Sequence, residues 1–284
     1  MKRTSALLAC LVVACATLTA VASGDPSKPK RDRGVTLRDL RGVNFVSACR
    51  FSHRAPDDPI VSPGQPGASH DHSFVGNRST NAFSTLDSLL GAGTTCRRAG
   101  ETAAYWMPTL LVAGKPVAPV GATIYYRRHS LDRVEPFPQG LKMVAGSAHA
   151  MSPQGRRITF WNCGAMAGIP PSSTVPTCPA GRGSYLRLHV SFPDCWDGRS
   201  LDSADHASHM AYSMRGRCAA SHPVAVPAIA LIYRYPVAGG PDVELSSGGQ
   251  YSGHADFFNA WEKGALNHLV NSCLNALHHC GHGS

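Results

Sequence analysis

The chain has 284 residues, a formal net charge of +9 with neutral histidines, ten cysteines and 14 histidines. This length is sufficient for one large β domain, because sandwiches and barrels often exceed 200 residues as a single unit. The basic residues are scattered and no nucleic-acid-binding motif accompanies them, which argues against a nucleic-acid partner. The positive charge either favours contact with acidic glycans and wall polymers or only keeps the protein soluble.

The N-terminus has the features of a secretory signal peptide. Residues 1–3 (MKR) are basic, residues 6–20 are largely apolar, and the small residues Ala20 and Ala22 flank Val21 at a cleavage-type site. We therefore expect residues 1–22 to be a signal peptide and the protein to be secreted. No later stretch is long and apolar enough to predict a transmembrane segment.

Residues 23–36 are polar, charged and proline-containing, so we expect a disordered lead-in there. Residues 37–284 are then expected to form a single β domain. Residues 12–15 (VVAC) also resemble a lipobox, so a lipid anchor at Cys15 is a minor alternative. Removal of the signal peptide takes away Lys2 and Arg3, which lowers the formal charge from +9 to +7.

Eight cysteines remain after the signal peptide, an even number in a chain expected to be exported, and this predicts four disulfides. A cysteine-rich metal site is the weaker alternative because no CxxC pair is present. Spacing does not determine the pairing, but local closure favours Cys163 with Cys178 and Cys273 with Cys280. The eight residues are Cys49, Cys96, Cys163, Cys178, Cys195, Cys218, Cys273 and Cys280.

The pattern of apolar residues indicates a mainly β fold. Alternation predicts strands over residues 43–51 and 185–192, and further strand candidates are residues 69–77, 105–112, 117–128, 141–145, 158–163 and 228–235. Residues 55–67 form a loop rich in proline and glycine, residues 84–87 open a short helix through a capping box, and residues 257–277 have the spacing of an amphipathic helix. We expect an antiparallel sandwich or jelly-roll-like domain with long loops.

Residues 192–210 (FPDCWDGRSLDSADHASHM) hold the densest group of polar side chains. Among Asp194, Asp197, Asp202 and Asp205 there could be a general acid and a general base for glycoside hydrolysis, or oxygen ligands for calcium. Aspartates in such runs more often stabilise turns by bonding to nearby backbone N–H groups. All three interpretations, glycoside hydrolysis, calcium binding and turn stabilisation, remain open at this point.

Three histidine-containing spacings suit metal ligation. His70 and His72 are two apart on a predicted strand and would point to one face. His206 and His209 are three apart in a turn or helical segment, and His254 is followed two residues later by Asp256. Copper or zinc would need three or four such ligands, and calcium is less expected. The alternative is that these histidines are hydrogen-bonded loop anchors.

Sugar binding is a further possibility. Trp196 lies in the polar loop and could stack on a sugar ring, as could Trp106, although tryptophans are more often buried in a core. Arg199 could meet the carboxylate of an acidic sugar. A histidine with a tyrosine and an arginine could also abstract a proton from a uronic acid, but candidates such as Tyr105 and Tyr212 have no predicted position.

Five segments in order carry a family resemblance. They are DDPIVSPGQPGASHDHSFVGN (57–77), AAYWMPTL (103–110), FPDCWDGRSLDSADHASHMAY (192–212), CAASHPVAVP (218–227) and GHADFFNAW (253–261). Together they resemble a secreted bacterial and fungal family, the domain of unknown function DUF1996. The resemblance implies an extracellular domain of a kind often associated with cell walls or secretomes, and it implies no particular activity. Its segments contain all three histidine spacings and add His222 as a candidate.

The leading hypothesis is a secreted enzyme acting on polysaccharide or cell wall, a hydrolase, lyase or metal-dependent oxidase, with a histidine-bound transition metal. The expected metal ligands are His70, His72, His206, His209, His254 and Asp256. The expected catalytic residues are His206, His209, Asp205 and Asp197, and the expected substrate contacts are Trp196, Trp106 and Arg199. The alternative is a non-catalytic glycan-binding or wall-structural module.

Overall fold

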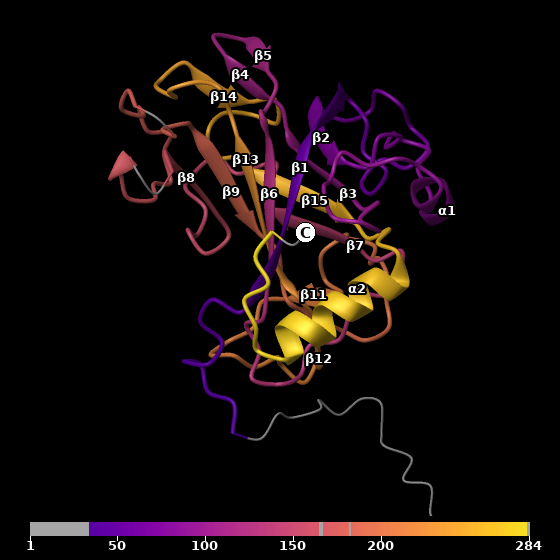
Figure 1. The fold of residues 1–284 in the computed structure, drawn as a ribbon. Helices are drawn as coiled ribbons and strands as arrows, with labels where there is room; N and C mark the ends of the chain where they lie inside the picture. Colours follow the sequence, from indigo (N-terminus) through magenta and orange to yellow (C-terminus); the bar gives the residue numbers. More distant parts are fainter. Residues whose placement is uncertain (1–33, 165–166, 182, 283–284) are drawn as a thin grey trace, which may run out of the picture.

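A nine-stranded antiparallel sheet organises the chain. The computed structural model describes residues 34–164, 167–181 and 183–282, so the predicted signal peptide, Cys15 and most of the predicted lead-in lie outside the described residues. The strand order across the sheet is β7 (Lys142–Gly146), β15 (His254–Phe258), β3 (Ala104–Pro108), β2 (His72–Gly76), β1 (Asn44–Ala55), β6 (Gly121–Arg127), β13 (Ala228–Arg234), β9 (Arg187–Ser191) and β8 (Thr159–Asn162). Figure 1 shows β1 and β6 at its centre.

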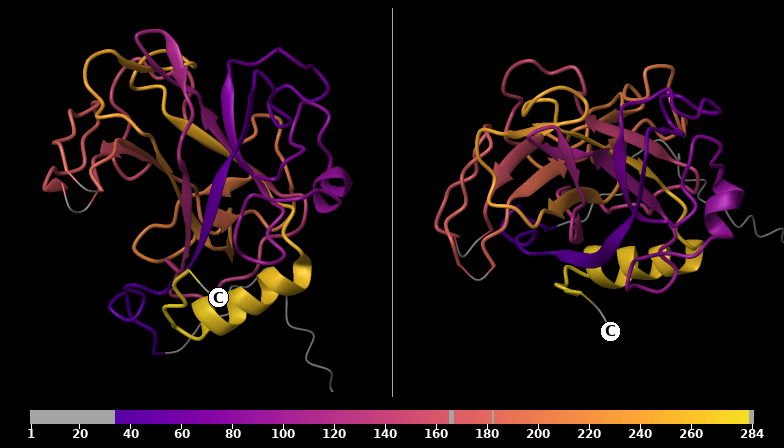
Figure 2. Two further views of the ribbon diagram at one scale, coloured as in Figure 1. Left: turned by 45° about the horizontal axis from the view of Figure 1, so that its top comes forward. Right: turned by 90° about the horizontal axis from the view of Figure 1, so that it is seen from above.

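Two small sheets and two helical segments complete the fold. One sheet joins β11 (Met210–Ala211), β10 (Cys195–Trp196) and β12 (Val224–Ala225), and the other joins β14 (Val243–Leu245), β4 (Leu110–Val112) and β5 (Lys115–Val117). The helices are α1 (Leu86–Leu90), α2 (Lys263–Leu269) and the π-helical continuation η2 (Val270–Asn275). The predicted antiparallel, mainly β class is confirmed, and the curled sheet makes the fold a near-barrel (Figure 2).

The large sheet buries side chains on both faces. The main core lies on the inner, concave face, where alternate residues such as Phe45, Tyr126, Leu188 and Phe257 are almost completely buried. A second, smaller cluster lies on the other face of the β7, β15, β3 and β2 half and includes Trp106. In this half β15, β3 and β2 are buried along their whole length, whereas buried and half-buried residues alternate in the edge strand β7.

Two predicted elements differ from the structure. Residues 105–112 do not form one strand, because β3 ends at Pro108 and β4 begins at Leu110 in a different sheet. Phe257 and Phe258 belong to β15 and not to the C-terminal helix, which begins only after Glu262 caps the amide N–H groups of Gly264 and Ala265. The apolar residues of a fully buried strand that leads into an amphipathic helix do not follow a single period. The sequence pattern therefore misplaced the boundary between the strand and the helix.

All eight predicted cysteines form disulfides, and both locally predicted pairs are present. The sequence separations of the bridges are 47, 15, 23 and 7 residues. Because every one of these sulfur atoms is covalently paired, the cysteine-rich metal site considered above is excluded. The pairs are Cys49–Cys96, Cys163–Cys178, Cys195–Cys218 and Cys273–Cys280. No helix among the described residues combines the length and apolar character that crossing a bilayer requires.

Candidate metal centre

The register of three neighbouring strands places polar side chains on the outer face of the sheet. His72 of β2 pairs with Pro108 of β3, and Trp106 of β3 pairs with Asp256 of β15. Since side chains alternate along a strand, His72, His254 and Asp256 all point to the face that also carries Trp106. β3 lies between β2 and β15, which carry the two histidines. At the position of His72, the residue of β3 is Pro108, whose side chain is a short ring.

His70, His72 and His254 form one cluster. The ring centroids are 4.2 Å apart for His70 and His72, 4.9 Å for His70 and His254, and 5.8 Å for His72 and His254. The Nε2 atoms of His70 and His254 are 3.1 Å apart. One ring nitrogen of each histidine lies within 4.8 Å of those of the other two. Nitrogen ligands at 2.0–2.1 Å from a tetrahedral ion are about 3.3 Å apart, so only small movements would let all three bind one ion.

Backbone carbonyls orient two of these rings. His72 Nδ1 lies 3.0 Å from the carbonyl oxygen of Asp57, and His254 Nδ1 lies 2.8 Å from that of Ser252. A carbonyl can only accept, so Nδ1 carries the hydrogen and Nε2 keeps its lone pair in both neutral rings. His72 Nε2 is buried without a hydrogen-bond partner. This is the arrangement that a metal-binding histidine requires, with the non-ligating nitrogen bonded to a carbonyl.

Burial keeps the three imidazoles neutral at ordinary pH. Desolvation lowers the pKa of His70 to about 4 and that of His254 to about 4, and it lowers the pKa of His72 well below its usual value. The neighbouring imidazoles lower the pKa of His72 and His254 further, while hydrogen bonds from Nδ1 to the carbonyls oppose the change. A histidine binds a metal ion in its neutral form, so no proton has to be displaced before these three rings bind one.

Two buried carboxyl groups lie next to the histidines. Asp58, His72 and Asp256 also have one possible ligand atom each within 4.8 Å of the others. Both side-chain oxygens of Asp256 are buried and accept no hydrogen bond, and Oδ2 is 4.0 Å from His254 Nε2. Burial, and secondly the charge of Asp58, raise the pKa of Asp256 well above its usual value. A buried carboxyl without donors is costly, unless a bound cation compensates for it.

The loop before β2 holds the remaining ligands. Asp58 Oδ1 accepts hydrogen bonds from the backbone N–H groups of Ile60 and Val61, at 2.8 and 2.9 Å. The Asp57 carboxylate accepts from the amides of Gly67 and Ala82, at 3.0 and 3.3 Å, so the proline- and glycine-rich loop has a defined shape. These bonds explain how a segment without regular structure can position Asp58 against a strand.

The backbone between His70 and His72 is also fixed. The Asp71 carbonyl accepts from Thr109 N at 2.9 Å and from Ser246 Oγ at 2.5 Å, and its carboxylate is 2.8 Å from Arg54 Nε. Consequently the two histidines are held on either side of an anchored residue. His72 and His254 are almost completely buried, and His70 is partly exposed, so the cluster reaches solvent through His70.

The donor set decides which ions fit. Imidazole nitrogens suit zinc and copper, whereas calcium binds oxygen ligands almost exclusively. Three histidines with neighbouring carboxylates therefore fit zinc or copper, and no calcium site is formed by this cluster. His70, His72 and His254 are the residues that could hold the ion, with Asp58 or Asp256 as further ligands or as hydrogen-bond partners of a bound water.

The structure does not bring His206 and His209 into this cluster, which corrects the predicted ligand set. Both nitrogens of His209 are already engaged, Nδ1 with Ser203 Oγ at 2.8 Å and Nε2 with the carbonyl of Lys142 at 2.7 Å. His206 Nδ1 is 2.9 Å from Asp202, which is also 3.5 Å from the Lys142 ammonium. Spacing of three residues gave no common face here because the segment is an irregular loop.

The predicted catalytic aspartates stabilise turns. Asp197 Oδ1 accepts from the amides of Arg199 and Ser200 at 2.8 and 2.9 Å. Asp205 Oδ1 accepts from the amides of Ala207 and Ser208 at 3.1 and 2.8 Å, and hydrogen bonds of this kind lower the pKa of the exposed Asp205 carboxyl. These carboxylates therefore remain charged and bonded, which does not suit a general acid.

Of the predicted sugar contacts, Trp106 is contradicted. Its side chain is fully buried in the outer cluster, so neither ring face is open to a ligand. Trp196 is half-buried, with its indole N–H donated to the Ser200 carbonyl at 2.7 Å, and Arg199 is exposed. Trp196 is the last residue of β10 and Arg199 follows it in the chain, and neither is a member of the three-histidine cluster.

Two residues near the centre were not predicted. Asp58 lies in a loop whose register no periodicity reveals, although it is inside the first of the five family-like segments. His149 follows β7, is exposed, and its charge contributes to lowering the pKa of both His70 and His254, which places it at the rim of the cluster. The spacing between His149 and the other histidines of the sequence does not suggest metal ligation, so the sequence could not identify it.

Comparison with known proteins gave one match. The model of a family described as "Domain of unknown function (DUF1996)" matches residues 58–261. The matched segment includes both carboxylates and all three histidines of the cluster. No curated protein and no solved structure matches the chain.

Proposed function

Since the chain belongs to the DUF1996 family, whose description assigns no activity, we propose its function from the geometry of the histidine cluster. We propose that the protein is a secreted, metal-dependent enzyme that acts on an extracellular glycan or cell-wall polymer. The observation that carries the proposal is the convergence of His70, His72 and His254 beside an unpaired buried carboxyl group.

A bound zinc or copper ion supplies Lewis acidity that activates water, and copper can also activate oxygen. The protein residues supply the rest of the site. His72 and His254 present oriented lone pairs from rigid strands, and His70 closes the ligand set on the solvent side. Asp256 Oδ2 lies 4.0 Å from His254 Nε2, and with a cation bound beside it the ionised Asp256 carboxylate would accept a proton from water at the site.

The remaining features support an extracellular glycan as the substrate class. Four disulfides are typical of proteins that work in an oxidising compartment. The positive net charge attracts acidic wall polymers. The centre opens to solvent at its His70 side, where Arg54, paired with Asp71, and the exposed His149 lie. A polymer can therefore approach this rim without entering the core.

Metal binding is tested first. The purified protein is stripped with a chelator, incubated with zinc, copper or calcium, desalted and analysed for metal content. We expect about one zinc or copper per chain, no retained calcium, and a weakening of at least about 100-fold in His70→Ala. His206→Ala is the matched control and should bind as the wild type does. Wild-type protein that retains neither zinc nor copper overturns the proposal.

Activity is tested on a panel of uronate polymers, chitin, β-glucans and peptidoglycan. New reducing ends, unsaturated products or oxidised products that depend on added metal and disappear in His70→Ala support the enzyme. His206→Ala should keep the activity, and thermal unfolding of both variants checks that they are folded. Retention of the protein on an insoluble glycan with no product, with metal bound, would contradict the enzyme and favour the binding or wall-structural module.

A further inference from the structure

A pair of cavities lies at the end of β1 that is opposite to the histidine cluster. Two adjoining cavities of about 540 Å³ and about 280 Å³ share Arg127, His129, Arg157 and Ser213 in their walls. The larger cavity is bounded by residues 37–44, the end of β6 and the turn at residues 213–216, and the smaller one extends along β13 and the start of the β9–β10 connection. We call the two together the basic groove.

The walls of the basic groove carry a marked excess of positive charge. Five arginines and one histidine line it, against a single carboxylate, Asp194. That carboxylate is buried and engaged by Ser213, through its amide and its hydroxyl, each at 2.8 Å. Asp194 therefore orders the turn, and its single negative charge offsets only one of the five guanidinium groups. The lining arginines are Arg41, Arg127, Arg128, Arg157 and Arg215.

These arginines have different roles. Arg128 is completely buried, and its guanidinium donates to the carbonyls of Ser130 and Leu131, so its role is structural. Arg157 and Arg215 are exposed, and within the described ranges neither is paired with a carboxylate. Arg127 is held 4.7 Å over a tyrosine ring. Several guanidinium groups therefore face the groove ready to bind carboxylate or sulfate, for which their planar geometry is suited.

The groove also has an apolar wall. Tyr212 is 39% exposed, and its hydroxyl donates to the Ser191 carbonyl at 2.8 Å, which fixes the ring at the mouth of the smaller cavity. Met214, on the same turn, is 67% exposed. A fixed aromatic ring beside cationic groups is suited to the apolar face of a sugar that also carries acid groups.

We propose that the basic groove binds an acidic oligosaccharide, a sugar chain bearing carboxylate or sulfate groups. Its volume is that of a site for a ligand of several rings and exceeds what a single inorganic anion fills. The spread of guanidinium groups over two connected cavities matches repeated acid groups along a chain. The proposal does not depend on the metal centre or on its activity.

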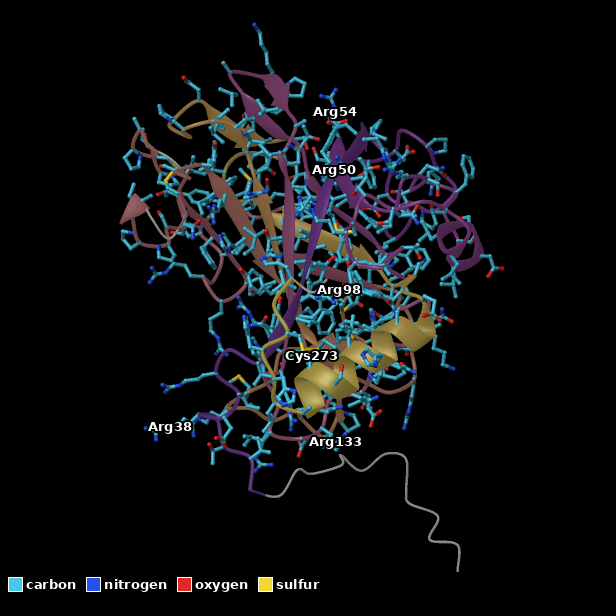
Figure 3. All side chains as sticks on the ribbon, in the orientation of Figure 1. Arg38, Arg50, Arg54, Arg98, Arg133 and Cys273 are labelled. Carbon is cyan, nitrogen blue, oxygen red and sulfur yellow. A yellow bond between two sulfur atoms is a disulfide. The ribbon has the colours of Figure 1, made fainter. Side chains whose placement is uncertain are left out.

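The groove and the metal centre are well separated. The groove borders Asn44, the first residue of β1, whereas His72 pairs with Ala55, the last. Twelve strand residues span roughly 36 Å. In Figure 3, Arg38 marks the groove end of the molecule and Arg54 the opposite end. The groove is thus an anchoring site that leaves the distant centre free.

The test measures binding of hexagalacturonate by calorimetry, with neutral cellohexaose, inorganic sulfate and a single-stranded dT hexamer as comparison ligands. We expect hexagalacturonate to bind, cellohexaose not to bind, and the double variant Arg157→Gln/Arg215→Gln to bind at least about tenfold more weakly. Arg97→Gln removes an exposed arginine that does not line the groove and should bind as the wild type does. His70→Ala should also keep the affinity, which separates this result from the metal proposal.

Three results would overturn the proposal. One is the absence of hexagalacturonate binding, or equal affinity in the wild type and the double variant when both show the same thermal unfolding. Another is binding of sulfate alone with the affinity of the hexasaccharide, which would indicate a site for free anions. The last is equal or tighter binding of the dT hexamer, which would indicate a general polyanion or nucleic-acid surface.

Discussion

Glu101 should make the protein less stable as the pH rises from 4.5 to about 7. Its carboxyl group is completely buried and accepts hydrogen bonds from Ser47 Oγ and from the Tyr105 hydroxyl, the latter at 2.7 Å. Burial raises its pKa from 4.5 to about 7, against the smaller opposing effects of these hydrogen bonds and of Arg98. Between these two values the folded state keeps a proton that the unfolded state has released.

The sign and size of the effect follow from proton linkage. Because the folded state binds more protons, the free energy of unfolding falls by about 1.4 kcal/mol for each pH unit in this window. Over the interval from 4.5 to about 7 the loss amounts to roughly 3 kcal/mol. The stabilising contribution of the neutral carboxyl is therefore complete below pH 4.5 and lost above pH 7.

Urea unfolding of the oxidised protein at pH 4.5 and pH 8 measures this difference for the wild type and for Glu101→Gln. The amide is nearly isosteric and cannot ionise, so the wild type should lose about 3 kcal/mol more than the variant between the two pH values. Glu244→Gln, which changes an exposed glutamate on β14, should leave the pH dependence unaltered. Parallel pH profiles for the wild type and Glu101→Gln would refute the reasoning.

Two further changes have definite expected outcomes. Asp256→Asn should stabilise the metal-free protein by about 1 kcal/mol, because it replaces a buried carboxyl group that receives no hydrogen bond, and it should weaken zinc or copper binding about 10- to 100-fold. Urea unfolding measures the first effect and metal titration the second. Lower stability with unchanged metal affinity would count against the ligand cluster. Gly76→Ala should lower the free energy of unfolding by about 3 kcal/mol or more, because Gly76 has a φ of +84° and a Cβ there would meet the Ala103 carbonyl oxygen at 2.4 Å. In the control Gly114→Ala, φ is +72° and nothing lies within 4 Å, so the same urea assay should show a loss of only about 1 kcal/mol. Similar losses in the two variants would show that crowding is not the cause.

The strands could be predicted where one face is buried and the other is not. In β9, Leu188 and Val190 are buried while Arg187, His189 and Ser191 are only partly so, and the alternation in the sequence gave this strand within two residues at its N-terminal end and one at its C-terminal end. The boundary between β15 and α2 was wrong because β15 is buried on both faces and its apolar run continues toward the helix. Periodicity locates half-buried elements and fails where burial is uniform.

The candidate site was predictable to the extent that it lies on strands. The two-residue spacings of His70 with His72 and of His254 with Asp256 have geometric meaning, because β2 and β15 carry them to one face. His209 is different, since its loop has no period and its partner, the Lys142 carbonyl, is 67 residues away. Loop contributions such as this depend on backbone hydrogen bonds that a single sequence does not reveal.

The ladder that places His72 and His254 on either side of Pro108 has a consequence for insertions and deletions. Removing one residue after His72 in β2 or after His254 in β15 would turn every later side chain of that strand to the opposite face, and in β15 this would take Asp256 away from His254. Such a slip would damage the folding core and the ligand cluster together. Length changes in the exposed stretch of residues 61–68 would leave both strand registers intact. Variation in length is therefore expected to accumulate around the centre and not within it.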